Sequence, residues 1–304
     1  MSVGTPDIDE VIELGFVVDP RLTLGELRHG PHDPTIRFER SVVWYAARTP
    51  GGPVTARLAP ASGGWRVSAW GPGAGLALAV VPRLLGAEDD PTALRLGPGR
   101  LRELAARLDG LRLGRTDAVW PALMAAICGQ KVTSAQAHRA YFGIVRRWGE
   151  EAPGPGGLRL HPRAEDVAAL PYYELHPVGL EQRRASVLIH AAQQAARLEQ
   201  AVGLAPAAAL ARLRSLPGIG VWTAAEVARS AFGDPDAVSI GDYHIPHLVS
   251  WALAGEPRGD DTRMLELLEP YRGQRARVVR ILECSGLRPP SYGPRLAPQR
   301  IEGL

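Results

Sequence analysis

Apolar and polar residues alternate in the first third of the chain in the manner of β-strands. Ile36, Phe38, Val42 and Trp44 give a partial two-residue alternation, the period of a strand with one buried face. Thr49-Pro50-Gly51-Gly52-Pro53 is a strong turn. Two further strands are expected over residues 54–58 and 65–70, and a helix packed on the sheet over residues 76–85. We therefore predict a small α+β domain with an antiparallel sheet over residues 1–95.

The pattern becomes helical after Asp89-Asp90-Pro91. Leu101, Leu104, Ala105 and Leu108 recur at helical spacing. Helices are expected over residues 101–108, 117–128, 134–148, 164–170, 181–200, 206–213, 222–232, 243–254, 262–268 and 274–284. The fold class is thus mainly α, with a helical domain over residues 96–287 and an extended tail over residues 288–304.

Composition places the chain among ordinary globular proteins and excludes several classes. Hydrophobic residues make up 45% and charged residues 22% of the 304 residues. The longest apolar stretch is interrupted by Pro82 and Arg83, which excludes a membrane span. The acidic start of the chain is unlike a secretory signal. Because Cys128 and Cys284 cannot build a disulfide framework, we expect the reducing cytoplasm as the location. We also expect a monomer.

Charge permits a polyanionic partner without requiring one. The net charge is +3 and the pI is about 9.1. Lys131 is the only lysine, and the abundance of Ala, Gly, Pro and Arg is typical of a GC-rich genome. An amine nucleophile that forms a Schiff base must therefore be Lys131 or the N-terminus.

Leu216-Pro217-Gly218-Ile219-Gly220-Val221 lies between two expected helices. Pro217 ends the first helix. Gly218 and Gly220, which are separated by one apolar residue, permit a tight turn with positive φ. Leu216 and Ile219 can pack between the helices, which leaves backbone N–H groups at the start of the second helix for an anion such as a DNA phosphate. An ordinary interhelical turn explains this pattern equally well.

Asp242 follows in Ser239-Ile240-Gly241-Asp242-Tyr243-His244-Ile245-Pro246. The preceding glycine and the following proline place Asp242 near a helix N-terminus. One interpretation is a simple N-cap. The other is a catalytic carboxylate that the helix dipole and free N–H groups hold in its ionised form.

Together, these residues resemble the helix-hairpin-helix (HhH-GPD) DNA glycosylases, in particular the bacterial inducible 3-methyladenine DNA glycosylases. Leu216 to Gly220 match the hairpin of that family, and Asp242 falls at its catalytic position. The resemblance covers most of residues 35–286 and also includes Ile127-Cys128-Gly129-Gln130 with Ser134, Pro270-Tyr271-Arg272 and the turn at residues 49–53. It implies DNA contacts from Leu216, Gly218, Ile219, Gly220, Gln130, Lys131 and Arg272.

The resemblance also implies a branch of the family. Trp222 stands where the strand-cutting 8-oxoguanine branch has its lysine nucleophile, and the four-cysteine iron–sulfur loop of other branches is absent. The only lysine, Lys131, is expected to lie far from the hairpin motif and is therefore a poor candidate for Schiff-base formation. We therefore expect a monofunctional enzyme without AP lyase activity and without a cofactor.

The implied base pocket contains two aromatic residues. Trp222 and Tyr271 match pocket aromatics of the family, and cationic purines methylated at N3 or N7 stack well on aromatic faces. Glu226 replaces a pocket tyrosine and either recognises the base or faces solvent. Lys131 replaces an apolar wedge and either fills the gap left by the extruded base or contacts a phosphate. The spacing of His244 and His247 does not favour a catalytic zinc site.

The sequence is compatible with three functional classes. The first is a glycosylase that excises alkylated purines from double-stranded DNA in base excision repair, in the nucleoid-associated cytoplasm, with hypoxanthine or uracil as alternative lesions. The second is a non-catalytic helix-hairpin-helix DNA-binding protein, which has no need of Asp242. The third, a small-molecule enzyme, is disfavoured by the joint spacing of hairpin, Asp242 and the Pro-aromatic-Arg segment.

Overall fold

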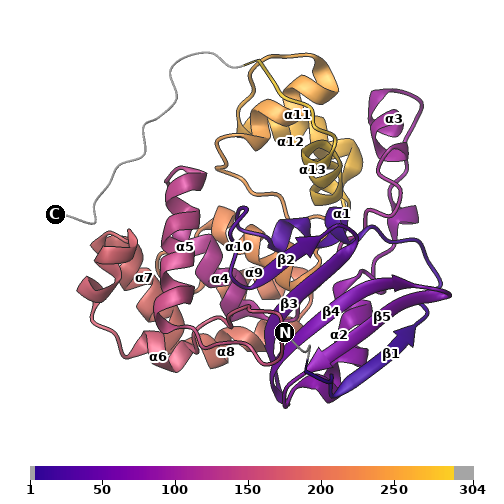
Figure 1. Cartoon of the computed structure of the whole chain (residues 1–304). Helices are drawn as coiled ribbons and strands as arrows, with labels where there is room; N and C mark the ends of the chain where they lie inside the picture. Colours follow the sequence, from indigo (N-terminus) through magenta and orange to yellow (C-terminus); the bar gives the residue numbers. More distant parts are fainter. Residues whose placement is uncertain (1–3, 291–304) are drawn as a thin grey trace.

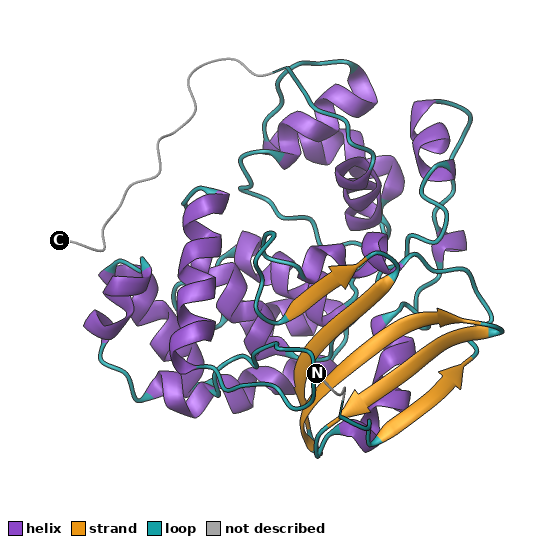
Figure 2. Ribbon diagram, in the orientation of Figure 1, coloured by secondary structure: helices purple, strands orange, loops and turns teal. Residues whose placement is uncertain are grey.

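The N-terminal region is a five-stranded antiparallel sheet with a helix on one face (Figure 1 and Figure 2). The structure, a computed structural model, describes residues 4–290. The strands run in the order β1-β5-β4-β3-β2, and their bounds are Ile8–Ile12 (β1), Ile36–Glu39 (β2), Val42–Thr49 (β3), Gly52–Ala61 (β4) and Gly64–Trp70 (β5). Helix α2 (Ala77–Leu84) buries Ala77, Val81 and Leu84 in the core of this sheet. The predicted antiparallel sheet and its helix are confirmed.

Two elements of this region escaped the sequence pattern. Strand β1 pairs with β5 at the edge of the sheet, from Ile8 opposite Ala69 to Ile12 opposite Trp65. Its three central residues are exposed, so the strand has no apolar alternation. Helix α1 (Pro20–Leu24) is a single short turn that Asp19 caps, too short to show helical periodicity.

The helical part of the chain has two hydrophobic cores. One core belongs to the α4–α10 lobe, whose helices are Val119–Cys128 (α4), Ser134–Trp148 (α5), Ala164–Ala168 (α6), Gln182–Gln193 (α7), Ala195–Glu199 (α8), Pro206–Arg214 (α9) and Val221–Val227 (α10). The other belongs to the α11–α13 lobe, whose helices are Ile245–Ala254 (α11), Asp261–Leu268 (α12) and Arg275–Cys284 (α13). Helix α3 (Arg100–Ala106) packs with this second lobe although it precedes α4 in sequence. The chain therefore crosses between the lobes twice.

The predicted helices differ from the observed ones at specific residues. The helix expected over residues 181–200 is interrupted at Gln194, between α7 and α8. Helix α11 begins at Ile245, two residues later than expected. The mainly α fold class is confirmed, whereas the domain boundary near residue 95 stays a prediction, because Leu94 and Leu96 on both sides of it pack on the same core. Most of the predicted tail, residues 291–304, lies outside the described residues.

Buried polar contacts hold the sheet against both lobes. Arg277 of α13 and Asp89, which follows α2, form an ion pair in which each side chain is 4% exposed. Tyr141 of α5 lies between Thr35 of the sheet region (3.2 Å) and Nε2 of His161 (2.8 Å). Burial lowers the pKa of His161 to about 3, so its ring is neutral at pH 7 and forms a hydrogen bond with the tyrosine hydroxyl. Within residues 4–290, no helix has the length and apolar character needed to cross a membrane.

Candidate active site

In the hairpin between α9 and α10, only one of the two glycines has a backbone conformation that requires glycine. Gly218 has a φ of +90°, and a Cβ atom there would lie 2.4 Å from Cγ2 of Val187. Gly220 has a φ of −88° and open space around it, so the positive φ expected at both glycines is wrong for Gly220. Gly220 is instead the extended N-cap residue of α10, where the missing side chain leaves the backbone uncovered. Leu216 and Ile219 are buried in the α4–α10 core, as the sequence predicted, and shape the turn from inside.

The loop after α4 lies directly against the hairpin. Nε2 of Gln130 donates hydrogen bonds to the Gly218 carbonyl and to Oγ1 of Thr223, each at 2.9 Å. Lys131 is the next residue; it is exposed and has a left-handed φ of +54°. The expectation that Lys131 is remote from the hairpin is therefore wrong, because helix packing brings together segments that lie 88 residues apart.

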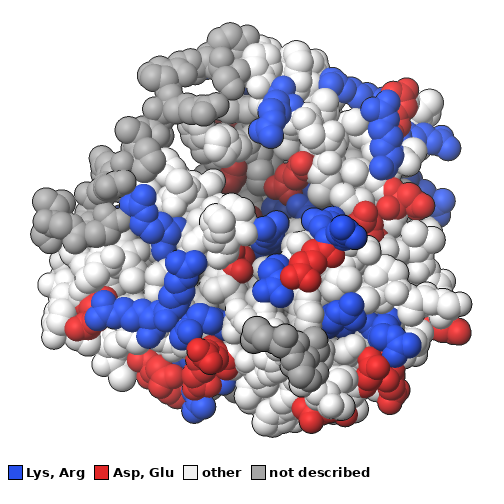
Figure 3. Space-filling model, in the orientation of Figure 1, with Lys and Arg blue, Asp and Glu red and all other residues white. Residues whose placement is uncertain are grey.

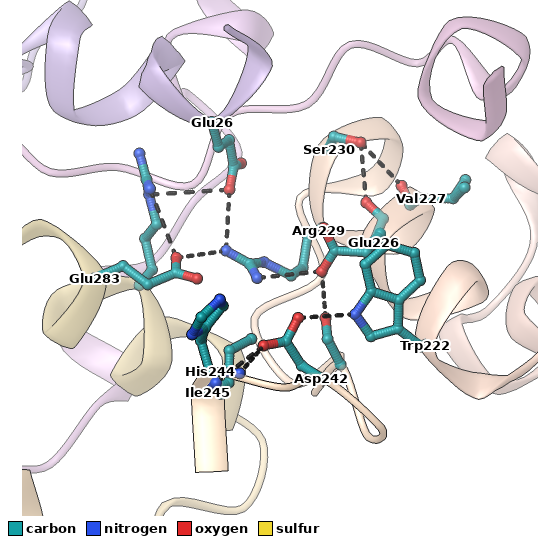
Figure 4. Close-up of polar contacts among 12 residues, drawn as sticks. Glu26, Trp222, Glu226, Val227, Arg229, Ser230, Asp242, His244, Ile245 and Glu283 are labelled. Carbon is teal, nitrogen blue, oxygen red and sulfur yellow. Dashed lines mark hydrogen bonds and ion pairs between the residues drawn. The ribbon is translucent and has the colours of Figure 1, made fainter. Parts of the chain in front are cut away.

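Asp242 lies where the chain returns from the α4–α10 lobe to the α11–α13 lobe. Its Oδ1 accepts hydrogen bonds from the backbone N–H groups of His244 (2.7 Å) and Ile245 (3.0 Å). Its Oδ2 accepts a hydrogen bond from Nε1 of Trp222 at 3.0 Å (Figure 4). The side chain is half-buried and forms no ion pair within residues 4–290. Oδ1 thus holds the backbone that leads into α11, whose N-cap is His244, whereas Oδ2 faces Trp222.

Trp222 connects three parts of the site. It is the second residue of α10, and its indole is half-buried on the α4–α10 core. A Cβ atom on Gly129 would lie 3.1 Å from Cη2 of Trp222, so the ring covers the end of α4. Because Nε1 points at Asp242, the indole links the hairpin, the α4 terminus and the carboxylate.

Glu226 lies one helical turn after Trp222 and belongs to a network of charges. Its Oε1 accepts a short hydrogen bond from Oγ of Ser239 and lies 3.5 Å from Nη1 of Arg229. Arg229 also pairs with Glu283 of α13 at 2.8 Å and with Glu26 of the N-terminal region at 3.5 Å. Burial raises the pKa of Glu226, and the charges of Glu283 and Asp242 raise it further, against the opposing effects of Arg229 and Ser239.

The hydrogen-bond and ion-pair partners of Glu226 were not predicted from the sequence. Arg229 and Glu226 are three residues apart on one helix, a spacing that predicts a pair. Ser239, Glu283 and Glu26 come from three other segments, and no local pattern joins them. The Glu226 side chain is 32% exposed and is held at one carboxylate oxygen. It is therefore neither freely solvated nor fully buried.

Tyr271 and Arg272 are not joined to this cluster by the described contacts. Tyr271 is half-buried against the α11–α13 core, and within the described part of the chain no ring contact links it to Trp222. Arg272 is exposed and pairs with Glu269 at 2.7 Å. Tyr243, which is 72% exposed, packs edge-on against His244 and His247. In residues 4–290, no group of three His, Cys, Asp or Glu side chains is arranged to hold a metal ion.

The surface charge around the site is mixed. Figure 3 shows basic side chains gathered over α5 and across the middle of the face in view, with acidic side chains between them. Such an arrangement agrees with the small net charge of +3. Local basic groups can therefore contact phosphates without a uniformly positive surface.

The fold and this hairpin-plus-aspartate arrangement define the family. Residues 124–272 match the sequence model of the family described as HhH-GPD superfamily base excision DNA repair protein. These residues, which contain α4, the hairpin and Asp242, are similar in sequence to the HhH-GPD superfamily. The resemblance inferred from the motifs is thereby confirmed.

Two relatives and one solved structure are similar to the chain. Thymine-DNA glycosylase of Aeropyrum pernix is 32% identical over 38% of this chain, and the match spans about half (47%) of that relative. DNA-3-methyladenine glycosylase 2 of Escherichia coli is 29% identical over 64% of this chain and 67% of its own length. The 3-methyladenine DNA-glycosylase structure from Archaeoglobus fulgidus superposes with a TM-score of 0.76 at 24% identity, over 91% of this chain and 98% of that one. At this identity, the structural likeness establishes the fold alone.

Proposed function

We propose that this protein is a monofunctional DNA glycosylase that hydrolyses the N-glycosidic bond of alkylated purines, of the 3-methyladenine and 7-methylguanine type, in base excision repair. It acts on double-stranded DNA as a cytoplasmic, nucleoid-associated monomer without a cofactor. The observation that carries the proposal is the position of Asp242, half-buried beside the hairpin, held by neutral donors and free of ion pairs among the described residues.

Asp242 has the chemistry that bond cleavage needs. As the N-glycosidic bond breaks, positive charge grows on the deoxyribose, and a preorganised carboxylate stabilises that charge. Three N–H donors fix the carboxylate geometry without neutralising its charge as an arginine would. The same oxygen atoms orient the water that attacks the sugar.

The hairpin supplies the grip on DNA. The N–H groups at the start of α10 have no acceptor within the helix, and the uncovered backbone at Gly218 and Gly220 lets a phosphate approach closely. Leu216, Ile219 and Gln130 shape and brace the turn, whereas Lys131 and Arg272 offer exposed charges to the DNA backbone. The extruded base then stacks on Trp222, with Tyr271 as the second proposed wall.

The monofunctional assignment rests on Trp222 at the position of the lyase nucleophile. Lys131 is next to the hairpin, so its position alone does not support this assignment. Borohydride trapping decides the point: a Schiff base between enzyme and DNA gives a covalent adduct. We expect no adduct with wild-type protein. An adduct that disappears in Lys131→Ala would overturn the monofunctional assignment.

A pyrimidine lesion is the second candidate substrate. The likeness to the thymine-DNA glycosylase favours it, and the hypoxanthine and uracil alternatives belong to the same test. Purified protein is incubated with duplexes that each carry one lesion, and abasic sites are then cleaved with alkali. We expect release of 7-methylguanine and 3-methyladenine above all others. If the protein prefers uracil or thymine, the alkylpurine assignment is wrong. If the protein releases no base from any duplex, the result supports the non-catalytic DNA-binding alternative.

A further inference from the structure

Glu226 and Asp242 converge on the same site from two segments of the chain. Trp222 and Glu226 are four residues apart on α10 and lie on one face of that helix, and Trp222 touches Asp242. Ser239 joins the two carboxylates: its Oγ donates to Glu226, and its carbonyl accepts the Asp242 N–H at 3.2 Å. Figure 4 shows the Asp242 carboxylate turned toward the indole nitrogen of Trp222 and the nearby Glu226 carboxylate turned toward Arg229.

The two oxygens of Glu226 have different surroundings. Oε1 takes the contacts from Ser239 and Arg229. Oε2 forms no hydrogen bond within residues 4–290, and it does not belong to the buried polar atoms that lack a partner. Oε1 is thus anchored, whereas Oε2 has no partner among the described residues and is not fully buried, so it can accept a hydrogen bond.

The charges behind Glu226 leave an excess of negative charge. Glu26, Glu226 and Glu283 face the two guanidinium groups of Arg229 and Arg280. Asp242 adds a fourth carboxylate that pairs with neither arginine. A cationic group that enters the site relieves the repulsion among these carboxylates, whereas a neutral group does not.

We propose that the Glu226 carboxylate accepts a hydrogen bond from an N–H group of the extruded base and selects cationic purines over neutral ones. This inference rests on the proposed glycosylase function and deepens it. Glu226 is a specificity-determining residue in this scheme, and Ser239 and Arg229 are positioning residues that hold its Oε1. The pKa of Glu226 is raised by burial and, further, by the negative charge of Glu283 and Asp242; that neighbouring negative charge also favours the arrival of a cation.

Glu226→Gln tests the inference because it removes the charge and keeps the shape. Single-turnover release is measured from two otherwise identical duplexes, one with cationic 7-methylguanine and one with neutral hypoxanthine. Loss of one charge-assisted hydrogen bond should lower the ratio of the two rates about tenfold. Glu256→Gln is the matched control, because Glu256 also pairs with an arginine, Arg263, at 2.7 Å but lies beyond the end of α11. The control should keep the wild-type ratio.

The outcomes separate this inference from the proposed function. A folded Glu226→Gln protein that keeps the wild-type ratio overturns the inference alone, whereas wild-type protein that releases no lesion overturns the proposed function. If Glu226→Gln does not fold, Ser239→Ala is used as the test variant. It keeps the charge of Glu226 but removes the hydroxyl group that donates a hydrogen bond to Oε1. We expect a smaller fall in the ratio for Ser239→Ala, and an unchanged ratio there also overturns the inference.

Discussion

Asp242 and Glu226 are two carboxylates that approach one indole side chain, yet they are held in opposite ways. Asp242 accepts hydrogen bonds only from two backbone N–H groups and from Trp222. Glu226 faces a guanidinium group that two further glutamates share. Neutral donors orient a charge without compensating it, whereas the ion network of Glu226 compensates its charge in part. The uncompensated carboxylate is suited to stabilising a cationic sugar, and the compensated one to recognising a ligand.

The largest expected effect is that of Asp242→Asn on base release. The amide oxygen of asparagine can accept the same two backbone hydrogen bonds, so α11 and the free energy of unfolding should be preserved. Without the negative charge, release of the lesion in single-turnover assays should slow about 10²- to 10⁴-fold. Binding to lesion-containing DNA, measured by fluorescence anisotropy, should stay near the wild-type value. Wild-type release by the folded variant would exclude a catalytic role for Asp242.

Trp222→Phe tests whether the neutral donor orients the catalytic carboxylate. The substitution keeps an aromatic face for the base and removes the N–H group that Oδ2 accepts. A lost hydrogen bond to a charged group should slow release about tenfold. Both 7-methylguanine and hypoxanthine duplexes should be affected to the same degree, unlike in Glu226→Gln. A change in the ratio of the two rates would mean that the two carboxylates are not separate in function.

The pH dependence of that same ratio follows from the direction of the pKa shift of Glu226. The pKa is raised, mainly by burial, so Glu226 takes up a proton before an ordinary glutamate does as the pH falls. The groups that face it are Arg229, Glu283, Ser239 and Asp242, with Glu26 and Arg280 behind. Protonation removes the charge that favours a cationic base, so the ratio of 7-methylguanine to hypoxanthine release should fall as the pH is lowered through the raised pKa of Glu226. Glu226→Gln should abolish this dependence; a wild-type slope in that variant would assign the titration to another group.

The smallest effect concerns the scaffold. Gly218→Ala places a methyl group against Val187 at a φ of +90°, which should lower the free energy of unfolding by ~1–3 kcal/mol. Gly220→Ala has an ordinary φ and open space, so its change should be within ~0.5 kcal/mol. Chemical denaturation measures both values. Equal destabilisation by the two substitutions would show that the hairpin geometry differs from that described here.

Local patterns were sufficient for much of the architecture. Residues 36–70 alternate as strands do, the helices of both lobes carry apolar residues at helical spacing, and Asp242 precedes a helix with proline in its first turn. Strand β1 and helix α1 were missed because exposed or very short elements bury too little apolar surface to leave a period in the sequence.

What the sequence alone determined is the set of chemical groups: one hairpin, one aspartate after it, one tryptophan at the start of α10 and one lysine. Which of them meet was decided by the tertiary structure, which brought Lys131 and Gln130 to the hairpin, turned Trp222 toward Asp242 and left Tyr271 on another core. The physical reason is that local periodicity indicates only which face of a helix or strand is buried. A contact such as that of Glu26 with Arg229 depends instead on how distant segments of the chain pack against one another.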